Sequence, residues 1–299
     1  MTTLDLVDEF RRYLLTERGL AVRTIEHYTE AAHAFLVARA ADDARVVKEW
    51  NAADVLTFVR RGSASYPPVR MQQLCTGLRA FLRYLCFRGY TLSDLSKCIP
   101  RIARWRLATL PKSLSAEQVD RMLIRCRRDK AGGRRDYAVL LLLSRLGLRA
   151  EELRRLTLDD IYWQRGELTV RGKGRGPEPM PLPQDVGEAL AAYLTHGRPA
   201  SGSRSVFVRL TPPHDAYGNS EAFGHIVRHA MRRAAVDAAS KGTHIFRHTL
   251  ATEMLRSGAS LREIGYLLRH RDEDTTRLYA KVDLVRLRTL ALPWPGGVL

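Results

Sequence analysis

The sequence predicts a mainly α-helical fold with a small antiparallel β-sheet, divided between two domains. Apolar residues recur at helical spacing through residues 4–105, a glycine-punctuated strand pattern follows at 161–183, and helical spacing returns from Glu221. At the end of the first helical region, a basic segment with proline at both ends, Pro100 to Pro111, breaks the helical spacing. We therefore expect a helical domain over residues 1–99, a linker over 100–112 and a second domain over 113–299.

Four helices are predicted in the first domain. Their apolar positions run over residues 4–15, 25–35, 55–62 and 74–85, with Gly19 and Gly89 after the first and the last and with Thr24 opening the second. Arginines lie between these positions and give the helices basic outer faces. A solvated bundle surface would carry the same arginines, so each one taken alone is weak evidence for a binding role.

The second domain is predicted to begin with a capped helix and to contain a hairpin. Ser115 and Gln118 have the spacing of a capping box, and Asp136 to Leu146 is an apolar helix suited to the centre of a core. Residues 161–163, 167–170 and 179–182 are predicted to be three short strands, with a glycine-rich turn at 172–176. Near the end of the chain, Ser260 to Glu263 form a second capping box.

The charge of the chain indicates a polyanionic partner. The chain carries 49 Lys and Arg against 32 Asp and Glu, a formal charge of +17, and both halves are basic. Its longest apolar run, Ala138 to Leu143, is far below the roughly 20 residues of a membrane span. Nucleic acid is therefore the predicted partner, and we expect no membrane association.

The start of the chain and its cysteines favour a cytoplasmic protein. Asp5, Asp8 and Glu9 interrupt the first residues, which argues against a signal peptide. The spacing of the four cysteines fits no zinc pattern, and a chain of this size does not need disulfides. We expect reduced, mostly buried thiols.

A cluster of polar side chains near residue 245 suits an anion better than a metal. On a helix that begins near Thr243, the side chains of His244, Arg247 and His248 share one face. Two histidines four residues apart have a zinc-ligand spacing, but the fixed charge of Arg247 between them opposes a cation. Arginine with donor-capable histidines is suited to phosphate, so no metal site is predicted.

Four motifs in order give the second domain a resemblance to a known family. They are Leu146-Gly147-Leu148-Arg149 with Glu152, then Gly172-Lys173-Gly174, then His244 to His248, and finally Leu267 to His270 with Thr275, Thr276 and Tyr279. In the order and spacing of these motifs the chain resembles the tyrosine recombinases of the phage integrase family. In size and layout it is similar to the Xer recombinases of that family. The helical first domain is similar to the core-binding domain of that family. No further DNA-binding domain is expected before residue 4, which favours an Xer-like or small mobile-element enzyme.

The resemblance implies an enzyme that cuts and rejoins duplex DNA, held between the two domains as in a clamp, in a tetrameric synapse or with a paired recombinase. It implies Tyr279 as the nucleophile that forms a 3′-phosphotyrosine, Arg149 and Arg247 as a clamp on the phosphate, and Lys173 as the general acid. It also implies that His244 and His270 are catalytic residues that add hydrogen bonds to the phosphate, with His248 and Glu152 in supporting roles. DNA contacts are expected from arginines elsewhere: Arg70, Arg79, Arg83, Arg104, Arg106, Arg175 and Arg269. No cofactor is implied.

Two positions depart from the family pattern. Arg269 stands where the family usually has glycine before the last histidine, and Lys281 stands where it often has histidine. Residues 284–292 have helical spacing, and the resemblance implies that this tail docks on a neighbouring protomer. Two other functions remain open from the sequence: a DNA-binding regulator with an idle site, and a type IB topoisomerase that relaxes DNA without strand exchange.

Overall fold

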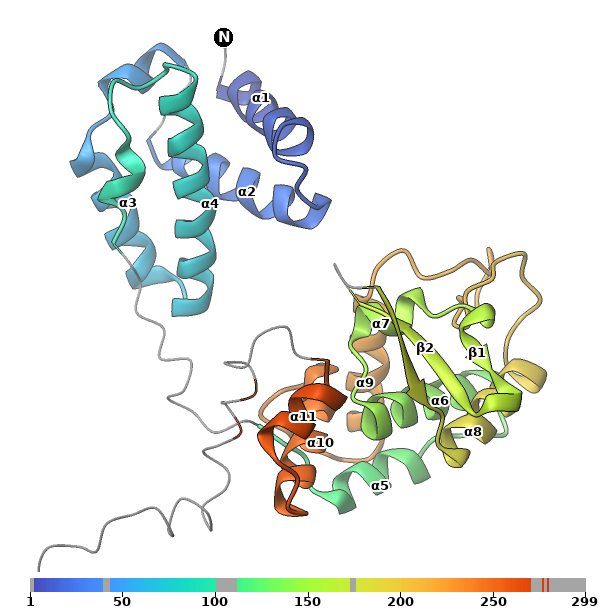
Figure 1. The fold of residues 1–299 in the computed structure, drawn as a ribbon. Helices are drawn as coiled ribbons and strands as arrows, with labels where there is room; N and C mark the ends of the chain where they lie inside the picture. Colours follow the sequence, from blue (N-terminus) through green and yellow to red (C-terminus); the bar gives the residue numbers. More distant parts are fainter. Residues whose placement is uncertain are drawn as a thin grey trace, which may run out of the picture. The chain divides into compact units, whose positions relative to one another are not determined.

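The protein is described by a computed structural model that covers residues 3–39, 44–100, 112–172, 176–269, 276 and 279. The chain divides into two compact units, Met1–Trp105 and Arg106–Leu299 (Figure 1). The described part is mainly helical with one three-stranded sheet, which confirms the predicted fold class. Residues 101–111 lie outside the described residues, so the domain boundaries given above stay a prediction.

The first unit contains the four predicted helices and two short 3-10 helices. Its elements are α1 (Thr3–Thr16), α2 (Val22–Ala38), η1 (Ala44–Glu49), α3 (Ala52–Ser65), α4 (Pro68–Phe87) and η2 (Leu95–Cys98). Gly19 follows α1 with φ of +55°, as its predicted role as a helix terminator requires. Thr24 lies inside the first turn of α2 and does not open it, because the N-cap residue is Ala21. Aromatic rings fill the centre of the unit, where Phe10 of α1 packs on Phe81 and Tyr84 of α4.

The second unit places helices around the buried helix α6. Its elements are α5 (Ala116–Ile124), α6 (Ala131–Leu146), α7 (Ala150–Arg155), η3 (Leu158–Asp160), β1 (Ile161–Tyr162), η4 (Trp163–Arg165), β2 (Glu167–Arg171), β3 (Pro177–Pro181), α8 (Gln184–His196), α9 (Glu221–Arg233), α10 (His244–Arg256) and α11 (Leu261–Leu267). Ser115 and Ser260 form the two predicted capping boxes, at the starts of α5 and α11.

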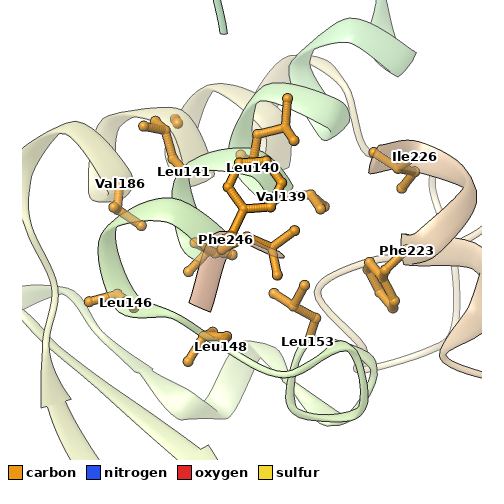
Figure 2. Close-up of a cluster of buried hydrophobic side chains, with 14 of the residues drawn as sticks. Val139, Leu140, Leu141, Leu146, Leu148, Leu153, Val186, Phe223, Ile226 and Phe246 are labelled. Carbon is orange, nitrogen blue, oxygen red and sulfur yellow. The ribbon is translucent and has the colours of Figure 1, made fainter. Parts of the chain in front are cut away.

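The core of the second unit fixes the start of α10 beside the end of α6. Every residue of α6 from Ala138 to Leu143 is buried. Figure 2 shows Phe246 of α10 among the α6 side chains, with Phe223 and Ile226 of α9 on one side and Val186 of α8 on another. Since Phe246 is anchored in this core, its neighbour Arg247 is held at the edge of α6.

The sheet is antiparallel in the order β1-β2-β3, with Leu168 of β2 paired with Met180 of β3. The third strand begins two residues earlier than predicted. Prolines occupy its alternate positions 177, 179 and 181. The backbone N–H of Leu182, which points to the same side as those of residues 178 and 180, donates to the carbonyl oxygen of Gly166. The prolines therefore remove donors that would point outward from this edge strand, which protects the edge from pairing with another strand.

The described residues also bear on the cysteines and on membrane insertion. All four cysteines are free thiols; Cys75 and Cys126 are buried, and Cys86 and Cys98 are half-buried. No helix in the described ranges has the length and apolar character needed to span a bilayer.

Candidate active site

The turn between α6 and α7 is built on Gly147. This residue ends α6 with φ of +58°, a left-handed conformation that favours glycine. A Cβ at this position would lie 2.8 Å from Leu268 Cδ2 and 3.1 Å from Leu250 Cδ2, so the side chains of Leu268, which follows α11, and of Leu250 in α10 pack closely on the turn. The turn leads directly to Arg149, the N-cap residue of α7.

Arg149 and Glu152 hold each other at the start of α7. The Arg149 backbone N–H donates to Glu152 Oε2 at 2.8 Å, and Arg149 Nη1 donates to Oε1 at 2.7 Å. Burial raises the pKa of Glu152, but the charge of Arg269 and the bonds from Arg149 outweigh it, so that the pKa is lowered. Glu152 is therefore a buried carboxylate that fixes the direction of Arg149, and about a third of the Arg149 side chain stays exposed.

Arg247 is a buried cation that does not use all of its hydrogen-bond donors among the described residues. It is 4% exposed, and its Nη1 donates to the carbonyl oxygen of Gly147 at 2.8 Å. Its Nη2 is buried and has no hydrogen-bond partner among the described residues. Burial, together with the positive charges of Arg149 and Arg269, lowers the pKa of Arg247 to about 9. A buried donor of this kind is the arrangement expected where an anion binds.

The two histidines of α10 are biased toward their neutral forms. Desolvation, followed by the charges of Arg247 and Arg149, lowers the pKa of His244, although the residue as a whole is exposed. Desolvation also lowers the pKa of His248, and His244 and Arg247 add to the shift. Each ring therefore keeps one nitrogen as a donor and one as an acceptor near neutral pH.

Tyr279 lies against His248. Its hydroxyl is 2.8 Å from His248 Nδ1, and the ring centroids are 5.7 Å apart. Tyr279 is 1% exposed, and burial raises its pKa to about 12 although the charge of Arg247 acts to lower it. At this spacing the Tyr279 hydroxyl can donate its proton to an unprotonated Nδ1.

The structure gives Arg269 partners inside the second unit. We expected its guanidinium to contact DNA, but the residue is 7% exposed and Nη2 donates to Glu152 Oε2 at 2.9 Å. Its Nη1 donates to the carbonyl of Leu267 and lies against Met180 Sδ. Arg269 has a positive φ of +53°, and in the DNA-free protein its side chain lies inside the second unit, so its DNA contact stays a prediction.

Several predicted site residues fall outside the described residues. They are Lys173 and Arg175 of the hairpin turn, Arg104 and Arg106 of the expected linker, and His270. The proposed tail, residues 284–292, lies outside them as well. The structure thus brings together Arg149, Glu152, His244, Arg247, His248 and Tyr279 from the predicted set.

Comparison with known proteins assigns the chain to a family. Residues 112–285 match the model described as the phage integrase family. The chain belongs to the phage integrase family. Tyrosine recombinase XerD of Listeria innocua is 30% identical over 294 residues, which cover 95% of this chain and 96% of XerD. The integrase/recombinase y4rA of Sinorhizobium fredii, so named only provisionally, is 45% identical over 97% of this chain and 71% of its own length.

Solved structures of tyrosine recombinases share the fold. The XerH site-specific recombinase bound to a palindromic difH substrate, in a post-cleavage complex, has a TM-score of 0.74 at 16% identity, covering 96% of this chain and 84% of XerH. A lambda integrase dimer bound to a COC′ core site has a TM-score of 0.72 at 14% identity, covering 95% and 97%. The predicted resemblance to this family is confirmed.

Three of the arginines predicted to bind DNA lie in α4, and each has a partner within the first unit. Arg70 forms an ion pair with Glu30 of α2. Arg79 Nη2 donates to the carbonyl oxygens of Ile99 and Pro100, at 3.2 and 2.7 Å, and Arg83 Nε donates to Ser96 Oγ at 3.3 Å. Arg79 thus holds the segment that follows η2 against α4, and Arg83 holds η2 itself. Their DNA contacts stay a prediction.

Two features of the site were not predicted from the sequence. Gly147 supplies the carbonyl that fixes Arg247, and a glycine directly after an apolar helix is a signal that could have marked it. The inward direction of Arg269 had no such signal, because arginine seldom adopts a positive φ. In the described part of the chain, no group of three or more His, Cys, Asp or Glu side chains could hold a metal ion.

Proposed function

We propose that this protein is a site-specific tyrosine recombinase or integrase that cleaves and rejoins duplex DNA through a covalent 3′-phosphotyrosine. The observation that carries the proposal is that the buried Tyr279 hydroxyl lies beside His248 and near the positively charged Arg247. The Tyr279 hydroxyl lies at hydrogen-bond distance from a histidine nitrogen. Arg247, close enough to shift the pKa of Tyr279, keeps a buried donor that has no partner among the described residues.

The charge of the cluster suits the reaction. Arg149, Arg247 and Arg269 carry three positive charges, and Glu152 carries one negative charge, which leaves two positive charges uncompensated. A phosphodiester carries one negative charge, and the pentacoordinate phosphorus formed by an attacking phenolate carries two. The cluster therefore stabilises the transition state more than the bound substrate, which is the condition for catalysis.

The proposed step moves one proton at each end. The Tyr279 hydroxyl transfers its proton to His248 Nδ1 as its oxygen bonds to phosphorus, and Arg149 and Arg247 bind the non-bridging oxygens. The bond from phosphorus to the 5′ oxygen then breaks, and Lys173 gives that oxygen a proton. His244 and His270 add hydrogen bonds to the phosphate. Attack by a 5′ hydroxyl reverses each transfer and restores the DNA strand.

The assembly is proposed from relatives. The XerH and lambda integrase structures hold these proteins on DNA, and one lambda integrase structure is a tetramer bound to a Holliday junction. We propose that this chain binds duplex DNA through both units and exchanges strands as a tetramer or with a paired recombinase.

The decisive experiment traps the covalent intermediate. Duplexes that the protein selects from a random pool would be resynthesised with a nick beside each candidate cleavage position, so that the cleaved fragment diffuses away and religation fails. We expect a protein–DNA adduct that resists denaturation and is absent with Tyr279→Phe. An adduct that persists in Tyr279→Phe shows that another residue is the nucleophile. Selected DNA that is bound but never joined to the wild-type protein shows a DNA-binding regulator.

Recombination is separated from relaxation with plasmids. A plasmid carrying two selected sites should yield recombinant products that depend on Tyr279, whereas relaxation of a supercoiled plasmid without recombinants indicates topoisomerase-like activity.

A further inference from the structure

The buried contacts of Arg269 point to a role in the site that was not expected from its place in the chain. Its guanidinium shares the Glu152 carboxylate with Arg149: Arg269 Nη2 donates to Oε2 at 2.9 Å, and Arg149 Nη1 donates to Oε1 at 2.7 Å. Its backbone also contacts Arg149, because the Arg269 carbonyl oxygen accepts a hydrogen bond from Arg149 Nη2 at 3.2 Å. Arg269 therefore contacts Arg149 directly through its main chain and indirectly through its side chain.

The backbone of Arg269 is in a conformation that arginine avoids. A φ of +53° costs a residue with a side chain about 1–2 kcal/mol relative to the right-handed region. This conformation turns the carbonyl toward Arg149 and the side chain toward Glu152 and Met180. The buried ion pair offsets the strain, so the local geometry depends on the arginine side chain being present.

The charge of Arg269 changes what Arg149 can do. If Glu152 had Arg149 as its one partner, the carboxylate would neutralise the guanidinium that is needed at the phosphate. With Arg269 bound to the same carboxylate, the negative charge of Glu152 is balanced by Arg269. The Arg149 guanidinium then keeps its positive charge while its direction stays fixed.

We propose that Arg269 is a positioning residue for Arg149, which acts through the shared Glu152 carboxylate and through its own backbone carbonyl to hold Arg149 charged and aimed at the scissile phosphate. Arg269 precedes His270, so the same contacts tie the end of α11 to the start of α7. The inference rests on the proposed DNA cleavage and assigns a part in it to a buried side chain.

The test replaces Arg269 by glycine, which fits the positive φ and so removes the side chain without adding backbone strain. At saturating DNA we expect Arg269→Gly to form the Tyr279 adduct roughly 10- to 100-fold more slowly in a single turnover, because a small misplacement of Arg149 has an effect of that size. The dissociation constant for DNA should change less than threefold, since the side chain is buried. Arg269→Lys, which restores a positive charge, should recover a large part of the lost rate.

Two further variants separate positioning from general damage. Arg262→Ala removes an exposed charge from the same helix and should cleave at the wild-type rate once bound. Glu152→Gln removes the shared negative charge and one of the two acceptor oxygens. Adding Arg269→Gly to it should lower the rate by less than threefold, because the ion-pair link is already broken. The double variant also avoids a buried carboxylate that has lost one of its two arginine partners, if Arg269→Gly alone fails to fold.

The outcomes distinguish this inference from the function on which it rests. If the wild-type protein forms no adduct, the proposed function fails. If the wild-type protein forms the adduct and Arg269→Gly forms it equally fast, Arg269 has no positioning role. A slow Arg269→Gly that Arg269→Lys does not improve, or full additivity with Glu152→Gln, also overturns the link through Glu152.

Discussion

At the scale of one residue, Arg247 has a buried charge that favours a bound anion and lowers the free energy of unfolding of the DNA-free protein. Its guanidinium is buried, faces the like charges of Arg149 and Arg269, and has a pKa lowered to about 9. A residue placed for folding alone would have a carboxylate partner or an apolar side chain. The DNA-free protein therefore carries a repulsion that a bound phosphate relieves.

This repulsion predicts that a neutral side chain at position 247 stabilises the DNA-free protein. Arg247→Met keeps much of the side-chain volume and removes the charge, although it gives up the bond to the Gly147 carbonyl. We expect the free energy of unfolding to rise by about 1 kcal/mol and Tm by roughly 3 °C, with cleavage abolished. Calorimetry in phosphate-free buffer, with Arg247→Lys as the variant that keeps the charge, provides the measurement. A lower Tm in Arg247→Met than in Arg247→Lys would contradict it.

His248 is predicted to set the pH dependence of cleavage. A protonated ring cannot accept the Tyr279 proton, and the pKa of His248 lies below its usual value of 6.5. Wild-type cleavage at saturating DNA should therefore be flat from pH 6.5 to about pH 8, below the pKa of about 9 of Arg247, and should decline below pH 6.5.

The companion variant His248→Phe keeps the ring and loses the acceptor, so its rate should fall by about 10²- to 10⁴-fold. Its residual rate should rise steadily with pH, because Tyr279, with a pKa of about 12, must then lose its proton to solvent. Equal pH profiles for both proteins, measured by adduct formation, would remove His248 from the proton transfer.

At the scale of elements, the site depends on how α6, α7, α10 and α11 meet. Phe246 anchors α10 in the core around α6, and Gly147 lets the chain turn from α6 to α7 beneath Leu268, which follows α11. The functional groups lie at the ends of these helices, where backbone carbonyls and side-chain caps are available to fix them. The packing of the core thus sets the positions of the charged groups.

Gly147→Ala tests this dependence, with Gly166→Ala as its control. Both glycines have φ near +60°, but a Cβ at Gly166 would meet nothing within 4 Å, whereas one at Gly147 would press on Leu268 and Leu250. We expect each variant to lose about 1–2 kcal/mol of stability from backbone strain, and Gly147→Ala to lose more. Cleavage should fall in Gly147→Ala alone. Denaturant unfolding and single-turnover cleavage check both statements, and similar cleavage by the two variants would show that the turn does not control Arg149.

The elements that the sequence predicted are those with strong local signals. The capping boxes at Ser115 and Ser260 and the hairpin of strands near 161 and 167 appear as expected, and the apolar helix α6 is present but begins five residues before Asp136. Helix α8 was not predicted, and its N-cap residue, Pro183, makes no side-chain cap. The direction of Arg269 could not be predicted either, because it results from a positive φ and a partner 117 residues away in the chain. Local patterns define caps and periods, whereas a buried ion pair between distant segments needs the folded core.

At the scale of the whole molecule, the net charge of +17 predicts how the protein binds DNA. Residues 1–110 and residues 111–299 are each basic, so phosphate contacts are expected from both units. A protein that makes 6–10 such contacts loses about 10³- to 10⁵-fold in affinity between 50 and 200 mM salt. We expect this chain to fall in that range on its selected site.

Titration of the full chain against labelled duplex at several salt concentrations gives the slope of log affinity against log salt. Arg83→Ala should make that slope shallower by about one, because one phosphate contact is lost, and should weaken binding to selected and unrelated duplexes alike. An unchanged slope would restrict Arg83 to its contact with Ser96. A wild-type slope that is nearly flat would mean that the basic surface is not the DNA-binding surface, since displacement of counterions by lysine and arginine is what makes such binding depend on salt.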